Sequence, residues 1–238
     1  MRYALKSIRR LVYGLLLLAS LSGVANAAIS VTVTALVNTN SNSGSAFSVG
    51  ETVTVTFTTV DGLGAPNLEN SATNVHWETT NDSSDFRFGP LFWSDITVSG
   101  TSGSYSSATS DHTSWLESGD RRNAFYAAVW EDGDNGFGLF KGGEEINFID
   151  AFVEPASLVP AVYGADSSVT PETTFFDGNF DVSGADTKTL FFYTNNWANE
   201  YIATIDTITI TGAAIPEPSS AFLVGLGVFC LGALRRRR

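Results

Sequence analysis

Hydrophobic and polar residues alternate through much of the middle of the chain. In 52–58, threonines take every second position, and two valines and a phenylalanine fill the places between them. The same period of two runs through 31–37. Successive side chains of a β-strand point to opposite faces, so this pattern predicts strands with one buried face and one polar face.

Shorter β-branched and aromatic runs continue between these segments, separated by clusters of Gly, Asn, Ser and Asp that are typical of turns. No helical period persists beyond one turn between residues 28 and 214. We therefore expect one all-β domain, an antiparallel β-sandwich of which the jelly roll is one form. The further predicted strands are 74–79, 91–99, 124–131, 137–140, 146–153, 173–181, 188–194 and 201–211.

The N-terminal end follows a different pattern. Four basic residues stand among the first ten, residues 11–21 are mostly apolar, and Ala25 and Ala27 supply the small side chains of a cleavage site. This order of parts predicts a secretory signal peptide over residues 1–27, cleaved before Ala28. Residues 28–214 then form the exported domain.

The C-terminal end, residues 215–238, has three parts in fixed order. Pro216, Glu217 and Pro218 form a triplet through which neither a helix nor a central strand continues. Residues 221–234 carry no charge, and as a helix they span about 21 Å, less than the roughly 30 Å hydrocarbon core of a bilayer. We expect a short transmembrane helix, whose cytoplasmic end is fixed by the basic residues that follow it. These are Arg235, Arg236, Arg237 and Arg238.

This three-part tail resembles a PEP-CTERM sorting signal. The resemblance implies processing near the Pro-Glu-Pro triplet by an exosortase, a membrane protease or transpeptidase of Gram-negative bacteria. It also implies an intermediate held transiently in the inner membrane, a final place at the cell surface or outside the cell, and a link to exopolysaccharide and biofilm. Only residues 215–238 carry the resemblance, and it implies nothing about the exported domain.

The charge of the exported domain limits its partners. Residues 28–214 hold five basic and twenty-four acidic residues, a net charge of −19, against −12 for the whole chain. This charge opposes binding to nucleic acid, and to an anionic polysaccharide without a bridging metal. The sole cysteine, Cys230, lies in the tail, so the domain has no disulfide and no catalytic thiol.

An acidic segment near the middle of the chain is a candidate calcium site. Glu131, Asp132, Asp134 and Asn135 place oxygen ligands close together beside two glycines. The spacing departs from the EF-hand, and Asp-Asn-Gly between apolar runs is also an ordinary hairpin turn. Both interpretations stay open, and we expect no other cofactor.

No motif assigns a catalytic residue. His76 and His112 lack the spacing of a zinc pair, and the chain has no G-x-S-x-G nucleophile elbow. A glycosidase needs two carboxylates in a cleft, but among so many acids some pair is inevitable. We therefore expect a protein that is not an enzyme.

The tryptophans carry the remaining functional hypothesis. The apolar residues directly before Trp93 and Trp130 place these two in the core, whereas Trp115 and Trp197 stand in polar segments that we interpret as loops. Exposed aromatic rings stack on sugar rings, so Trp115 and Trp197 are the candidate glycan-binding residues.

Three functions follow from the sequence. The first is a non-enzymatic structural component of the cell surface or matrix. The second is a carbohydrate-binding module, with calcium as a candidate aid, and the third is a polysaccharide hydrolase. A binding module should show a row of exposed aromatic rings and a hydrolase a cleft with converging carboxylates; a structural protein should show neither.

Overall fold

The structure is a computed structural model, and it describes residues 28–41, 44–59, 74–80, 93–106, 112–119, 123–131, 136–161 and 174–212. The signal peptide and the tail lie outside these residues. Antiparallel strands dominate the described part, as predicted. They are β1 (Ser30–Asn40), β2 (Thr52–Thr59), β3 (Asn74–Thr80), β4 (Trp93–Val98), β5 (Ser102–Gly103), β6 (His112–Gly119), β7 (Ala124–Glu131), β8 (Leu139–Lys141), β9 (Glu144–Glu154), β10 (Gly178–Asp181), β11 (Thr187–Thr194) and β12 (Asn199–Thr211), with the short 3₁₀ turn η2 (Ala156–Leu158) after β9.

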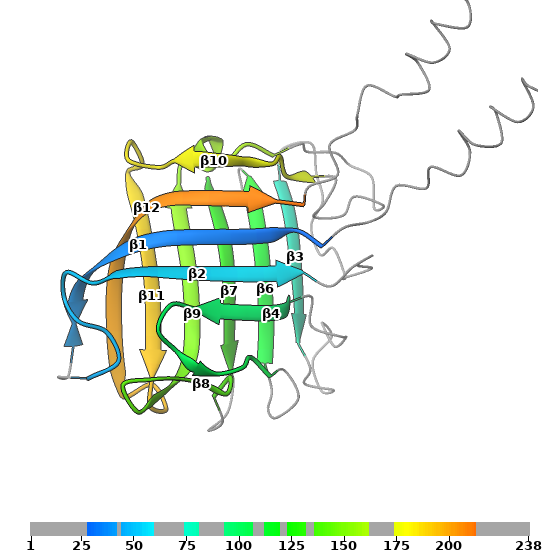
Figure 1. The fold of residues 1–238 in the computed structure, drawn as a ribbon. Helices are drawn as coiled ribbons and strands as arrows, with labels where there is room; N and C mark the ends of the chain where they lie inside the picture. The colour runs from blue at the N-terminus through cyan, green and yellow to red at the C-terminus, as the bar shows by residue number, and fades with distance from the viewer. Residues whose placement is uncertain are drawn as a thin grey trace, which may run out of the picture. The chain divides into compact units, whose positions relative to one another are not determined.

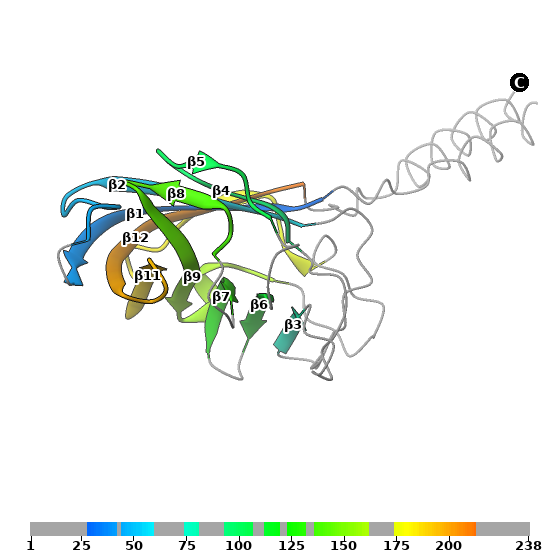
Figure 2. The same ribbon diagram turned by 90° about the horizontal axis from the view of Figure 1, so that it is seen from below.

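One continuous sheet forms both layers of the domain, in the order β3-β6-β7-β9-β11-β12-β1-β2-β4. In Figure 1 the strands β10, β12, β1, β2 and β4 lie across β11, β9, β7, β6 and β3. Figure 2 shows these two groups as separate layers seen from below. The predicted sandwich is therefore a curled sheet. Four of its pairs, β1–β2, β6–β7, β8–β9 and β11–β12, join consecutive strands, and the other described pairs join strands further apart in the chain.

The sheet curls at β12, which belongs to both layers. Its first half, Asn199 to Thr204, pairs with β11, whereas its second half, Thr207 to Ile210, pairs with β10. Its partner β1 follows the bend through two register shifts, between Thr34 and Ala35 and near the end of the strand. Such irregularities increase the local bend and twist of a strand, so they let one sheet fold over onto itself.

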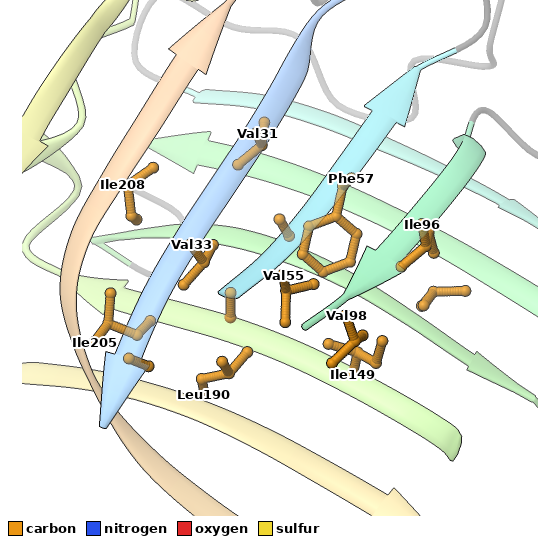
Figure 3. Packing of buried hydrophobic residues seen from close by; sticks show 14 of the residues in the cluster. Val31, Val33, Val55, Phe57, Ile96, Val98, Ile149, Leu190, Ile205 and Ile208 are labelled. Atoms are coloured by element: carbon orange, nitrogen blue, oxygen red, sulfur yellow. The ribbon is translucent and has the colours of Figure 1, made fainter. Parts of the chain in front are cut away.

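The core lies between the layers and follows the period of two. Val33 in β1 and Val55 in β2 are fully buried, and they face Ile149 and Leu190 from the opposite layer (Figure 3). Trp93 crosses the same space, because its Nε1 donates to the carbonyl oxygen of Ala128 in β7 at 2.9 Å. Burial of the alternating apolar positions thus joins the two layers.

The outward side of the first layer is a field of small hydroxyl side chains, here called the threonine face. The Oγ1 atoms of Thr32 and Thr56 lie 3.0 Å apart, and the hydroxyl oxygens of Ser30 and Thr58 lie 3.2 Å apart. Cross-strand pairs of this kind stabilise neighbouring strands. The face consists of Ser30, Thr32, Thr34, Thr54, Thr56, Thr58, Thr97, Thr207, Thr209 and Thr211.

The two ends of the exported domain are neighbours. Ser30 pairs with Thr211 in the β1–β12 ladder. The next residue, Gly212, has a φ of +84° and lies so close to the Ala28 carbonyl that a Cβ atom would collide with it. The first and last strands of the domain are therefore paired up to the residues at which each leaves the sheet.

Among the residues that the structure describes, no helix is long and apolar enough to cross a membrane. The predicted transmembrane segment, 221–234, lies outside those residues. It stays a prediction from the sequence.

Candidate functional site

The outward side of the second layer carries aromatic residues on four neighbouring strands. Trp130 in β7, Phe148 in β9 and Tyr193 in β11 stand directly opposite one another in the register of the sheet. Trp115 in β6 extends the row on one side, and Trp197, after β11, extends it on the other. We call this surface the aromatic face; it consists of Trp115, Tyr126, Trp130, Phe148, Phe152, Tyr193 and Trp197.

The rings form an unbroken series. The centroid distances are 5.6 Å from Trp115 to Trp130, 6.5 Å from Trp130 to Phe148 and 5.3 Å from Phe148 to Tyr193. Trp197 lies 5.1 Å from Tyr193 and 5.3 Å from Phe148. All these spacings are those of interacting aromatic pairs. The face therefore behaves as one preorganised surface and not as scattered apolar residues.

The most exposed ring, Trp197, sits on an unusual turn. Asn195, Asn196 and Trp197 all have positive φ, at 53°, 54° and 64°. Asparagine adopts this region with little penalty, but a tryptophan rarely does. The backbone N–H groups of Asn195 and Asn196 donate to the Glu145 carbonyl at 2.8 Å and to Asn147 Oδ1 at 2.9 Å. The turn thus holds Trp197 against the row with 42% of its surface exposed.

The tryptophan predictions have mixed outcomes. Trp93 is in the core and Trp197 is in a turn, as predicted. Trp115 is not in a loop, because it lies within β6. Trp130 is not a core residue: it is partly exposed on the aromatic face, since Val129 takes the inward position beside it.

Carboxylate groups accept hydrogen bonds from the polar atoms of three of these aromatic side chains. The hydroxyl of Tyr126 donates to Asp150 Oδ2 at 2.7 Å. In the same way, the hydroxyl of Tyr193 donates to Glu200 Oε1 at 3.1 Å. A third bond of 3.2 Å runs from the indole N–H of Trp115 to Glu117. Burial, followed by the charge and hydrogen bond of Glu200 and the charge of Asp150, raises the pKa of Tyr193.

The predicted calcium site is only partly within the described residues. Glu131, at the end of β7, is buried, and its Oε1 accepts a hydrogen bond of 2.8 Å from Asn147. Asp132, Asp134 and Asn135 lie outside the described residues. In the described ranges, no group of three or more His, Cys, Asp or Glu side chains is placed to hold a metal ion. Calcium binding stays a prediction.

Both histidines lie inside the protein. His76 stacks on Trp115 at 4.5 Å between ring centroids, and its Nε2 lies 3.4 Å from Glu78. His112 is buried with its ring edge-on to Phe137, and burial lowers its pKa to about 4. Each histidine ring therefore packs against another aromatic side chain.

A second polar cluster, missed at the sequence level, surrounds Glu144 at the start of β9. Tyr201 and Asn199 donate to its Oε2 at 2.8 and 3.0 Å, Thr194 donates to the same oxygen, and Ser45 donates to Oε1 from its backbone and its hydroxyl. Burial raises the pKa of Glu144, but these hydrogen bonds lower it to about 2. The carboxylate ties the segment before β2 to β9, β11 and β12.

Comparison with known proteins identifies the tail. Residues 214–238 match the PEP-CTERM protein-sorting motif. This chain carries a PEP-CTERM sorting motif. The PEP-CTERM motif implies processing by an exosortase, export with transient membrane anchoring, and arrival at the cell surface. The resemblance seen in the sequence is confirmed, and the family of the exported domain stays unassigned.

The exported domain itself has no such match. No curated protein and no solved structure is significantly similar to the chain. The function of the domain therefore has to be argued from its own surfaces. The individual roles of the triplet, the arginines and the signal cleavage residues stay predictions.

Proposed function

We propose that this PEP-CTERM protein is a non-enzymatic component of the cell surface or extracellular matrix that binds polysaccharide through its aromatic face. The observation that carries the proposal is the series of rings from Trp115 to Trp197. A purely structural component needs no such series on its outward surface. The two leading sequence hypotheses therefore merge into one, a matrix protein that holds glycan.

Sugar rings have an apolar face of C–H groups and a polar rim of hydroxyls. A flat aromatic ring buries the first and leaves the second to hydrogen-bond with water or protein. The rings of Trp130, Phe148 and Tyr193 sit on paired strands, so binding requires little ordering of side chains or backbone. Several ring positions in series suit a chain of sugars better than a single monosaccharide.

The carboxylates of this face favour binding over hydrolysis. Glycoside hydrolysis needs one carboxyl group free to donate a proton and a second one poised on the sugar ring. Glu117, Asp150 and Glu200 each accept a hydrogen bond from an aromatic side chain of the face. Their positions suit the support of the rings, which is why a hydrolase is not the function proposed.

The proposal is tested by affinity electrophoresis of the full chain, kept in mild detergent, through exopolysaccharide purified from the producing cells. We expect Trp197→Ala to weaken binding roughly tenfold, the loss of one stacking contact of about 1.5 kcal/mol. Thr209→Ala, on the threonine face, is the matched control and should bind like the parent. Equal binding by both variants, with both folded, would contradict the proposal.

The sorting part of the proposal has its own test. Intact mass of the protein from its own cells should show a chain that begins at Ala28 and ends near Pro216–Pro218. Replacement of the triplet by alanines should leave Arg235–Arg238 attached. If the parent protein also keeps the arginines, the tail is a permanent anchor and the processing proposal fails.

A further inference from the structure

We propose that the aromatic face selects a glycan with free amino groups, a cationic amino-sugar polymer, through the carboxylate of Glu200. This inference rests on the proposed function and names the substrate class of the same face. It depends on three features: the position of Glu200 beside the most exposed rings, the negative field along the row, and the places of the basic residues.

Glu200 stands at the exposed end of the row. It lies in β12 directly opposite Tyr193 in β11, and it accepts the hydroxyl of that ring at 3.1 Å. Tyr193 in turn lies 5.1 Å from the half-exposed Trp197. Glu200 itself is partly exposed, so one carboxylate borders the two rings that a ligand reaches first.

A second carboxylate faces the row from the adjacent strand. Asp150 in β9 is paired with Phe191 and lies on the same outward side as Phe148, two residues away. The charges of both Asp150 and Glu200, together with burial, raise the pKa of Tyr193. The two acids therefore act on the same ring, and the centre of the row lies in a negative field.

The basic residues that the structure describes are placed elsewhere. Lys141 pairs with Glu51 and donates to the Ser99 carbonyl, and Lys188 donates to the Ser183 carbonyl. Neither lies on the aromatic face. An exported domain with a net charge of −19 repels anionic polysaccharide, and it attracts a polymer of ammonium groups over distances of about a Debye length.

The chemistry of an amino sugar fits this arrangement. Its ring can stack on Trp197 or Tyr193 while the ammonium group, at the rim of the ring, points toward Glu200. An ammonium group donates three hydrogen bonds, and a carboxylate accepts them in charge-assisted form. An N-acetylated sugar of the same shape brings no charge, so it would cover part of Glu200 without compensation.

The experiment compares two ligands of one backbone: β-1,4-linked glucosamine oligomers and their fully N-acetylated counterparts of equal length. Binding to the full chain in mild detergent is measured by calorimetry at pH 6, where the free amines are protonated, at low and high salt. We expect the free-amine oligomer to bind about fivefold more tightly, the upper range for a partly exposed ion pair. Added salt should remove most of that preference.

Two variants locate the preference. Glu200→Gln should abolish it, because the free-amine oligomer loses its ion pair while the acetylated oligomer binds at least as tightly as it does to the parent. Asp95→Asn removes the same charge from the exposed outward side of β4, bordering the threonine face. This control should keep the preference, because Asp95 does not lie on the aromatic face. A general attraction between a polycation and an acidic protein would instead weaken equally in both variants.

The outcomes separate this inference from the function on which it rests. Equal or tighter binding of the acetylated oligomer, lost in Trp197→Ala, overturns the amino-sugar selection and leaves glycan binding standing. A free-amine preference unchanged in Glu200→Gln also overturns it, because the charge then acts from another surface. If neither oligomer binds and the native exopolysaccharide is not retained either, both proposals fall.

Discussion

The two outward faces of this domain are built on the same antiparallel pairing, yet they differ in kind. On the threonine face, Thr32 and Thr56 turn their hydroxyls toward each other across the strands. On the aromatic face, Trp130, Phe148 and Tyr193 turn large rings outward at corresponding positions. The inward residues of both layers are alike, because both fill one core. The two layers therefore differ in their outward-facing side chains and not in their inward-facing ones.

The difference also concerns how each face meets water. Small hydroxyl groups that bond to one another or to water leave little apolar surface to cover. Neighbouring rings at 5 to 6 Å spacing expose a continuous apolar surface, and its contact with water is unfavourable. A surface of that kind on an exported protein is typical of an interaction site. Four experiments test this contrast, from the largest expected effect to the smallest.

Two tryptophans on opposite sides of the sheet give the sharpest contrast in stability. Trp93 is 1% exposed, packs on Phe57 at 5.1 Å and bonds to the backbone of the facing layer. We expect Trp93→Ala to lower the free energy of unfolding by about 3–5 kcal/mol. Trp197→Ala should lower it by less than about 1 kcal/mol, since the ring is half-exposed. Urea unfolding measures both changes in free energy. Equal losses would mean that Trp197 contributes to stability as a core residue does, and the contrast would fail.

Glu144 tests whether a partly exposed carboxylate that belongs to neither face contributes to stability. We expect Glu144→Gln to lower the free energy of unfolding at pH 7 by about 2 kcal/mol, because charge-assisted hydrogen bonds are lost. In the parent, a folded pKa of about 2 against the ordinary 4.5 means that this stability is full above pH 4.5 and is lost as the pH falls toward 2. The variant should lose stability less steeply in that window. Parallel pH profiles in urea titrations would contradict this role.

Trp130 tests whether the inner part of the aromatic face contributes to binding. Trp130→Ala should weaken the retention of exopolysaccharide about fivefold, a loss of about 1 kcal/mol. The residue lies between Trp115 and Phe148, so the deletion interrupts the series of rings. Affinity electrophoresis measures the effect. Full retention would limit the binding surface to the Tyr193–Trp197 end.

The threonine face should respond least. Replacing Thr32 and Thr56 by valine removes one cross-strand hydroxyl pair but keeps the β-branched shape. We expect a change of about 0.5 kcal/mol or less in the free energy of unfolding, and no change in glycan binding. A double-mutant cycle in urea gives the coupling of the pair. A clear loss of glycan retention would mean that both faces bind, and the contrast would fail.

Strands with one polar face were predictable from the sequence. The alternation in 31–37 and 52–58 correctly indicated β1 and β2, because only one of their faces is buried, and the run of isoleucines and threonines in 201–211 correctly indicated β12. Strand β6 was missed. Its sequence HTSWLESG is polar but almost entirely buried on both faces, so neither alternation nor an apolar run marks it. Trp115, which lies in that strand, was consequently assigned to a loop.

The candidate site was less predictable than the core. Trp115 and Trp197 were chosen from the sequence, and the structure does place both on one surface. The rings between them were not found, because their alignment depends on the register of strands far apart in the chain. Trp130 shows the difficulty: the mainly apolar run before it, 124–129, does not alternate with polar residues, so it does not reveal whether Trp130 points inward or outward. The left-handed turn under Trp197 has no local marker beyond its two asparagines.

The pairing of β1 with β12 limits when the sheet can close. Strand β1 cannot complete its pairing until the last strand, β12, has been synthesised and exported, since Ser30 pairs with Thr211. Contacts so distant along the chain form slowly. The sorting motif begins at residue 214, directly after that strand. The two layers can therefore close only once the chain up to the start of the sorting motif is available for pairing.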